Sequence, residues 1–307
     1  MNIIEIHNLS KSFKTQENAL SDINLEIKEG EIFGFIGPDG AGKTTLFRIL
    51  ATLLKPSSGK SYVFSKDTVK DYLDIRGNIG YMPGKFSLYG DLTVLENLEV
   101  FAGLYKIDTF KNKDLIDPVY KQLAPFSNRR AADLSGGMKQ KLALCCAIVH
   151  KPKLLFLDEP TTGVDPSSRK DFWRIIKLLQ KEGITIIAST PYMDEASLCD
   201  RIALIQKGEI LSISTPEELI SNYPGDLYSV SSSSMYPLLK FLKNQDFISS
   251  VFPFGDTHHI RLNSNISPEN AKIAIESSGF DQIEIKKIQP SIEDCFMYLS
   301  TRAYDEA

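Results

Sequence analysis

Short apolar runs alternate with helical repeats from the start of the chain to about residue 210. Residues 32–36 and 154–157 are apolar almost throughout and too short for helices, which predicts two buried strands. Elsewhere apolar residues recur at three- and four-residue spacing, as at Leu46, Ile49 and Leu50, which predicts helices that pack by one face. Strands that alternate with helices are typical of an α/β domain with a mostly parallel core sheet.

Turn and cap residues mark where further elements begin and end. Pro166 is expected to open a helix that Gly183 closes, because proline suits the first helical position and glycine the position after the last turn. The pair Lys207-Gly208 is expected to join two strands in a hairpin. Pro191 is expected to begin another helix, with Thr190 as its cap.

A different pattern follows a looser stretch at residues 215–226, which holds two prolines and Gly225. The remainder is predicted as strand, helix, two strands, helix, strand and a last helix, at 228–232, 236–243, 248–252, 258–262, 268–278, 283–288 and beyond. That order suits a small split βαβ sandwich, an α+β arrangement. We therefore predict a first domain at residues 1–222, with a helical part at about 85–150, and a second at 223–307.

A glycine-rich segment stands between the first buried strand and the next helix. It reads Gly37-Pro38-Asp39-Gly40-Ala41-Gly42-Lys43-Thr44-Thr45 and fits G-x-x-x-x-G-K-[ST]. Glycines let consecutive backbone N–H groups turn toward phosphate oxygens, and the start of the helix adds partial positive charge. Lys43 supplies a point charge for the phosphates, and the Thr44 hydroxyl can ligate Mg²⁺. We predict a nucleotide-phosphate site here; the alternative is a turn that binds nothing.

Two carboxylates end the second buried strand. Asp158 is expected to lie beside the phosphate loop, where it can hold Mg²⁺. Glu159, one residue further on, is placed to polarise an attacking water. An acidic pair after a strand is a weak signal by itself, and it gains weight because a phosphate loop precedes it.

A second helix start suited to anions occurs at Leu134-Ser135-Gly136-Gly137-Met138. Ser135 can cap this helix, while Gly136 and Gly137 let its first turn approach another group closely. One chain already has its phosphate loop. A dimer in which each chain covers the ATP held by its partner is therefore the economical explanation.

Residues 1 to about 215 resemble the ATPase subunits of the ATP-binding-cassette (ABC) family, on four motifs in order. These are the phosphate loop, the signature at 134–138, the acidic pair at 158–159 and Gly163-Val164-Asp165-Pro166. The resemblance implies a P-loop NTPase cassette that uses ATP and Mg²⁺, with Asp165 in the loop where two subunits meet. It also implies that Phe13 stacks on the adenine; the alternative is a strand residue packed in the core.

Two segments are similar to one branch of that family. The tail Pro290-Ser291-Ile292-Glu293-Asp294-Cys295-Phe296 resembles the end of an extra domain on drug-resistance-type exporter ATPases, and residues 161–166 are similar to that branch too. The alternative for the tail is a capped amphipathic helix that packs on its own sheet. The resemblance implies an exporter's ATP-binding subunit, peripheral on the cytoplasmic face of the membrane, with integral membrane transporter subunits as partners.

The chain departs from the family at two positions of the catalytic cluster. Gly84 stands where the family carries Gln, and Pro191 stands where it carries His. Losing one preorganised transition-state donor costs about 3–4 kcal/mol, so we expect a site that holds ATP and hydrolyses it slowly. A heterodimer whose partner supplies both groups is favoured. The alternative is a homodimer with two slow sites, rescued by Lys85 or a water.

Composition narrows the remaining choices. The 307 residues are 42% apolar and 24% charged, and the net charge of −4 gives no support for a nucleic-acid partner. No run approaches the roughly 18–20 apolar residues of a membrane span, and the first residues alternate like a strand. The four cysteines form no CxxC pair, so burial in a reduced compartment is favoured over a redox or metal role.

Two other functions compete with that of a transporter subunit. One is a soluble cassette that acts on ribosomes or DNA, and the other is a purely regulatory ATP-binding protein.

Overall fold

The structure, a computed structural model, describes residues 1–14 and 16–305 of the chain. It divides into two compact units, Met1–Pro216 and Glu217–Ala307. The division falls at the start of α7 (Pro216–Ser221), within the stretch that we expected to be irregular. That expectation was wrong for α7, because Pro216 stands at a helix start, the position where its fixed φ and missing N–H do no harm.

The core sheet of the first unit runs in the order β10-β9-β3-β8-β7-β6. Its strands are β3 (Ile32–Ile36), β6 (Ile79–Met82), β7 (Leu154–Asp158), β8 (Thr185–Thr190), β9 (Arg201–Gln206) and β10 (Glu209–Ser214). All neighbours pair in parallel except β9 and β10, which form the expected hairpin. The prediction of a mostly parallel core sheet is thus confirmed.

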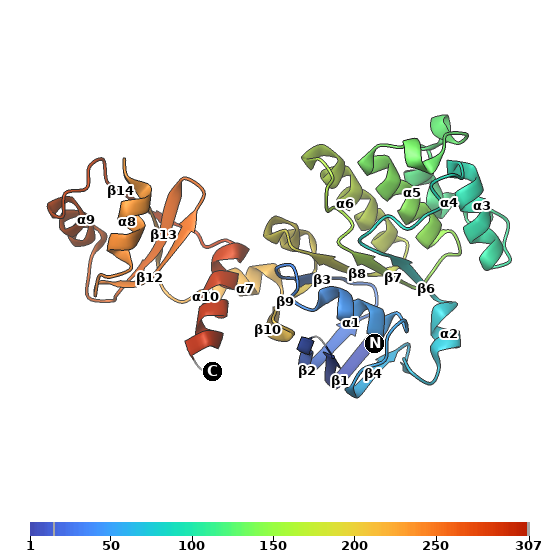
Figure 1. The fold of residues 1–307 in the computed structure, drawn as a ribbon, viewed down its shortest axis with the longest axis horizontal. Helices are drawn as coiled ribbons and strands as arrows, with labels where there is room; N and C mark the ends of the chain where they lie inside the picture. The colour runs from blue at the N-terminus through green and yellow to red at the C-terminus, as the bar shows by residue number, and fades with distance from the viewer. Residues whose placement is uncertain (15, 306–307) are drawn as a thin grey trace. The chain divides into compact units, whose positions relative to one another are not determined.

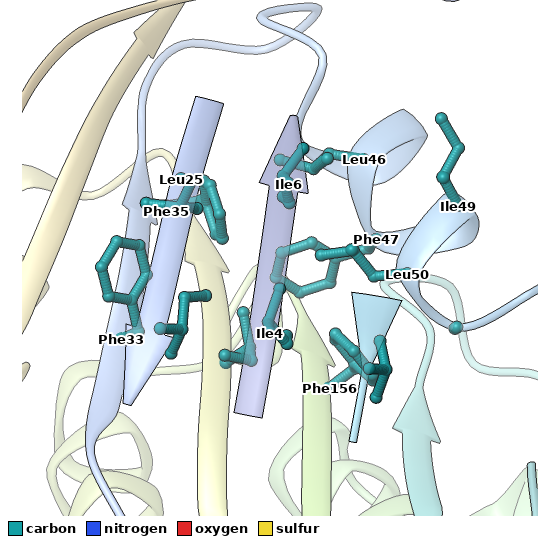
Figure 2. Close-up of a cluster of buried hydrophobic side chains, with 14 of the residues drawn as sticks. Ile4, Ile6, Leu25, Phe33, Phe35, Leu46, Phe47, Ile49, Leu50 and Phe156 are labelled. Carbon is teal, nitrogen blue, oxygen red and sulfur yellow. The ribbon is translucent and has the colours of Figure 1, made fainter. Parts of the chain in front are cut away.

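A second, antiparallel sheet faces the core sheet across helix α1 (Lys43–Leu50). Its strands are β2 (Gln16–Lys28), β1 (Asn2–Phe13), β4 (Ser58–Val63) and β5 (Lys66–Asp67), in that order. Side chains of both sheets and of α1 meet in one buried cluster, as Figure 2 shows. The Phe47 ring lies 5.8 Å from that of Phe35 and 5.7 Å from that of Phe156.

The other helices of the first unit lie mostly on the side of the core sheet opposite α1 (Figure 1). They are α2 (Tyr72–Arg76), α3 (Val94–Leu104), α4 (Lys113–Tyr120), α5 (Gly136–Ile148) and α6 (Pro166–Lys181), with 3₁₀ turns η1 (Ala124–Phe126), η2 (Ala131–Asp133) and η3 (Met193–Leu198). Helices α3 and α4 both pack on α5. No helix in the described part of the chain is long and apolar enough to cross a membrane.

The helix expected to begin at Pro191 is absent from that place in the described chain. Strand β8 continues to Thr190, and the 3₁₀ turn η3 starts only at Met193. A residue before proline avoids helical dihedrals, so Thr190 stays extended. Its hydroxyl caps a local turn instead, accepting a hydrogen bond from the Tyr192 N–H at 3.0 Å.

The second unit has the predicted element order. Its elements are β11 (Leu227–Ser231), α8 (Met235–Leu242), β12 (Ile248–Phe254), β13 (Thr257–Leu262), α9 (Pro268–Ser277), β14 (Glu284–Ile288) and α10 (Ile292–Asp305). The antiparallel order β12-β13-β11-β14 is that of a split βαβ sandwich. In the tail, the Asp294 carboxylate accepts a hydrogen bond from the Ser291 hydroxyl at 2.6 Å and contacts His259 Nδ1 of β13 at 2.7 Å. These bonds fix α10 on the sheet of its own unit.

The four cysteines are buried and carry free thiols. Burial raises the pKa of Cys199 to about 12 and that of Cys145 well above its usual range. Thiols with such high pKa values are unreactive near neutral pH, which supports the packing role that the sequence favoured.

We expect Phe47→Ala to lower the free energy of unfolding of the first unit by about 3–5 kcal/mol, because it empties a fully buried site. The single tryptophan, Trp173 of α6, reports on this unit in a urea titration followed by fluorescence. Leu104→Ala is the control, since that side chain is 70% exposed and its loss should change stability by less than about 0.5 kcal/mol.

Candidate nucleotide site

The glycine-rich loop connects β3 to α1, the placement that its motif requires. Gly42 has φ +106°, and a Cβ there would lie 2.7 Å from the Ala19 carbonyl oxygen, so only glycine fits. In the described chain no side chain caps the start of α1. Its first backbone N–H groups are therefore free to bind an anion.

A pocket of about 130 Å³ opens at this helix start. Its lining combines one residue of β2, the loop, the first turn of α1 and the acid that follows β7: Ala19, Gly40, Ala41, Gly42, Lys43, Thr44, Thr45 and Glu159. Of the other predicted site residues, Gly37 is buried, while Pro38 and Asp39 are exposed on the loop. The structure thus brings the phosphate-loop residues and the predicted catalytic acid to one place.

The Lys43 ammonium is the positive charge of this pocket and is only 3% exposed. Its Nζ donates to the carbonyl oxygens of Gly37, at 2.7 Å, and Pro38, at 2.9 Å. The Glu159 carboxylate lies 3.5 Å from the same nitrogen. A buried ammonium needs such partners, and phosphate oxygens would be stronger ones because they carry full charge.

The Asp158 carboxylate ends β7 and is buried against three hydroxyl groups. Its Oδ1 accepts hydrogen bonds from Thr44 Oγ1 at 3.0 Å and from Ser189 Oγ at 2.8 Å. Its Oδ2 lies 3.4 Å from the Tyr81 hydroxyl. Burial raises the pKa of Tyr81 to about 12, with the charge of Asp158 adding to the rise, so this hydroxyl keeps its proton near neutral pH.

Ser189 and Tyr81 are site residues that sequence reasoning missed. Ser189 is a polar residue at the carboxyl end of a buried strand, next to the strand that carries the acids. That position was a usable signal, because buried polar side chains usually have hydrogen-bond partners. Tyr81 carried no comparable signal, since a partly buried tyrosine on a buried strand is common in cores.

The backbone at Gly84 runs close to the acidic pair. A Cβ at this position would lie 3.0 Å from the Asp158 carbonyl oxygen and 3.7 Å from Glu159 Cβ. Position 84 therefore faces the acids, as the sequence comparison with the family implied. Any side chain placed there requires the loop to move by a few tenths of an ångström.

The signature residues lie at the start of α5, away from the pocket lining. Ser135 caps the helix and accepts from the Met138 N–H at 3.4 Å. A Cβ on Gly137 would lie 3.1 Å from Ser168 Oγ of α6, so this glycine permits close packing within the chain. Gly136 remains exposed and faces the Gly163 carbonyl.

Asp165 and Phe13 are the remaining predicted residues, and neither lines the pocket. Asp165 caps α6 and accepts from the N–H groups of Ser167 and Ser168. Hydrogen bonds from Ser168 lower the pKa of Asp165, which keeps the cap charged. Phe13 ends β1 with 39% of its surface exposed, and Lys11 Nζ lies 5.1 Å above its ring. This exposure is not that of a core residue.

The donor set fits a hard divalent cation held together with phosphate. Thr44 and Asp158 would supply two oxygen ligands, which lie 3.0 Å apart. No cluster of three or more His, Cys, Asp or Glu side chains suited to a metal is found in the described residues. Magnesium is commonly held by one or two protein oxygens plus phosphate oxygens and water. One carboxylate and one hydroxyl beside a phosphate cradle match that pattern.

Fold and site together define a P-loop nucleotide-binding protein, and comparison with known proteins gives its family. A family model described as ABC transporter matches residues 20–162. Nod factor export ATP-binding protein I of Rhizobium sp. (strain N33) is 31% identical over 307 residues, which cover 99% of this chain and 98% of that protein. The chain therefore belongs to the ABC transporter ATP-binding proteins.

Two further similarities bear on the length and assembly of such proteins. The probable multidrug ABC transporter ATP-binding protein YbhF of Escherichia coli (strain K12) is 37% identical over 302 residues, 97% of this chain and 52% of YbhF. The chain thus spans about half the length of YbhF. The dimeric structure of MJ0796, a bacterial ABC transporter cassette, is 29% identical with a TM-score of 0.63, covering 69% of this chain and 98% of that chain.

We expect Lys43→Ala to weaken Mg·ATP binding about 10–100-fold, because a charge-assisted hydrogen bond contributes about 1.5–3 kcal/mol. Isothermal titration calorimetry measures the change. Lys55→Ala is the matched control, since Lys55 is exposed and outside the pocket lining. Equal affinities of the wild type and the Lys43 variant would contradict the assigned role.

Proposed function

We propose that this chain is the ATP-binding subunit of an ABC exporter and that it binds ATP with Mg²⁺. The observation that carries the proposal is the meeting of Lys43 and Thr44 with Asp158 and Glu159 at one end of the parallel sheet. The names of the related proteins, which include export and multidrug functions, support the exporter branch. The membrane pathway would belong to separate integral membrane subunits, with this chain peripheral on their cytoplasmic side.

Each residue of the site has a definite task in ATP hydrolysis. The loop N–H groups and Lys43 bind the phosphates, and they orient the terminal phosphate toward the acidic pair. Asp158 and Thr44 would hold the cation, which would neutralise phosphate charge when bound. Glu159 accepts hydrogen bonding from the attacking water and polarises it. Ser135, Gly136 and Gly137 would act on the partner cassette's nucleotide, and in the chain itself they lie away from the pocket.

The chain's own site is proposed to be slow. Gly84 has no side chain to reach the water or the cation, although its backbone faces Asp158. Pro191 has no hydrogen-bonding side chain to reach a terminal phosphate. The binding groups are in place, so affinity should suffer far less than rate. An asymmetric heterodimer follows as the favoured assembly, because an intact signature can serve a partner that carries both missing groups.

An apolar groove on the first unit suits a segment of a membrane subunit. It has a volume of about 270 Å³ and lies between the end of α1, β6, α3 and α5. Its lining includes Leu53, Phe101 and Tyr105, and Leu53 is 55% exposed. Burial lowers the pKa of His150, which stacks on Tyr105 with ring centroids 3.7 Å apart, so its ring adds no charge at neutral pH.

The test of the slow site is ATP turnover by the purified chain, measured over a range of protein concentrations. We expect tight Mg·ATP binding with negligible turnover. The double variant Gly84→Gln/Pro191→His should raise turnover, by up to about 10²–10³-fold for each donor restored. Glu159→Gln should leave binding intact and remove any residual turnover.

A matched control separates the effect of the glutamine amide on turnover from the effect of added side-chain volume at position 84. Gly84→Ala/Pro191→His introduces the same Cβ near Asp158 but no amide, so it should fall short of the glutamine variant. Ordinary turnover by the wild-type chain, independent of protein concentration and abolished by Glu159→Gln, would contradict both the slow site and the heterodimer.

The test of the groove is co-purification of the tagged chain with an integral membrane protein from its own cells. We expect Leu53→Asp to abolish that association, because a charge on the rim opposes burial of the apolar groove. Leu178→Asp is the control, since Leu178 is also exposed but lies on α6, outside the groove. Loss with both variants, or with neither, would argue against this docking place.

A further inference from the structure

The hydroxyl of Ser189 joins the two acidic residues of the site. Ser189 lies on β8 opposite Asp158 of β7 and is fully buried. Its Oγ donates to Asp158 Oδ1 at 2.8 Å and accepts from the backbone N–H of Glu159 at 3.0 Å. One side chain thus contacts both the predicted cation ligand and the residue that carries the predicted base.

The backbone of Glu159 needs such support. Its φ is +50°, in the left-handed region, which costs a residue with a side chain roughly 1–2 kcal/mol. The same N–H also lies 3.1 Å from the carbonyl oxygen of Ser189, so the hydroxyl and the carbonyl of Ser189 both hold this turn. Strained backbone at a site persists only where its surroundings hold it.

The direction of the two hydrogen bonds is fixed by chemistry. A hydroxyl has one proton to donate, and the Glu159 N–H can only donate. The proton of Ser189 must therefore point at Asp158, and its lone pair at Glu159. Thr44 donates to the same Asp158 oxygen at 3.0 Å, but Thr44 is itself a predicted cation ligand. Ser189 is therefore the donor to Asp158 Oδ1 that has no competing task, while the Tyr81 hydroxyl faces the other carboxylate oxygen, Oδ2, at 3.4 Å.

We propose that Ser189 is a positioning residue that aims the Asp158 carboxylate at the cation and the Glu159 carboxylate at the attacking water. It acts through these two residues and does not itself line the pocket. The proposal rests on the proposed function above. The proposal also goes beyond that function. Gly84 and Pro191 offer no side chain that could orient the two acids, so their orientation depends on Ser189 of the buried strand β8.

The test is binding of a fluorescent ATP analogue by the full chain, with Mn²⁺ as the metal and in EDTA. We expect Ser189→Ala to weaken metal-dependent binding about 10–100-fold, the usual effect of losing a group that orients a metal ligand. Binding in EDTA should change less than about twofold, because the phosphate loop is untouched. The electron paramagnetic resonance spectrum of protein-bound Mn²⁺ should change as well.

Two variants separate positioning from general stability. Ser189→Thr keeps the hydroxyl and should bind Mn²⁺·ATP nearly as the wild type does. Ser61→Ala removes another buried serine hydroxyl, which pairs with Thr68 Oγ1 at 2.7 Å on the antiparallel sheet, and should leave metal-dependent binding unchanged. Ser189→Cys, with a similar volume but a weak donor, serves the same comparison where alanine fails to fold.

The outcomes are distinct. Wild-type metal-dependent binding in Ser189→Ala, an equal loss in Ser61→Ala, or an equal loss in Ser189→Thr would each overturn the positioning role. A wild-type chain that binds no Mn²⁺·ATP at all would overturn the proposed function first and this inference with it.

Discussion

The buried carboxylate of Asp158 is the constraint on which the rest of the site depends. A buried carboxylate needs hydrogen-bond donors, and here they come from α1, β6 and β8 through Thr44, Tyr81 and Ser189. Placing this one group therefore ties the helix that follows the phosphate loop to three neighbouring strands. The parallel arrangement makes this possible, because the carboxyl ends of β3, β7 and β8 meet at one edge of the sheet.

The two departures from the family lie just beyond that same edge, and the fold accommodates both. Gly84 follows β6 where the chain passes close to the Asp158 carbonyl, a position that favours the smallest residue. Pro191 follows β8 at the point where the extended backbone ends. Neither residue interrupts the hydrogen bonds of the core sheet or of the phosphate loop. Binding and folding can therefore be retained without the side chains that would reach the attacking water, the cation and the terminal phosphate.

The sequence predicted the elements well wherever burial leaves a local pattern. The split βαβ unit and the parallel sheet follow from periodicity, and the phosphate loop follows from residue types at fixed spacing. The role of Ser189 could not be read in this way, because its partners depend on how β7 and β8 pair. Pro191 and α7 were predicted incorrectly for a related reason. A proline restricts the backbone dihedral angles of its own residue and of the preceding one, but these restrictions do not determine whether a helix begins there.

The contact between Lys43 and Glu159 joins the phosphate loop to the predicted base. The ammonium lies 3.5 Å from the Glu159 carboxylate, and this attraction draws the carboxylate toward the phosphate loop. A phosphate bound at the start of α1 competes for the same ammonium, and it does so with a larger negative charge. Glu159 would then be released from Lys43 while its backbone stays held by Ser189. On the proposed function, the Glu159 carboxylate would thus be free to polarise a water once a nucleotide occupies the phosphate loop.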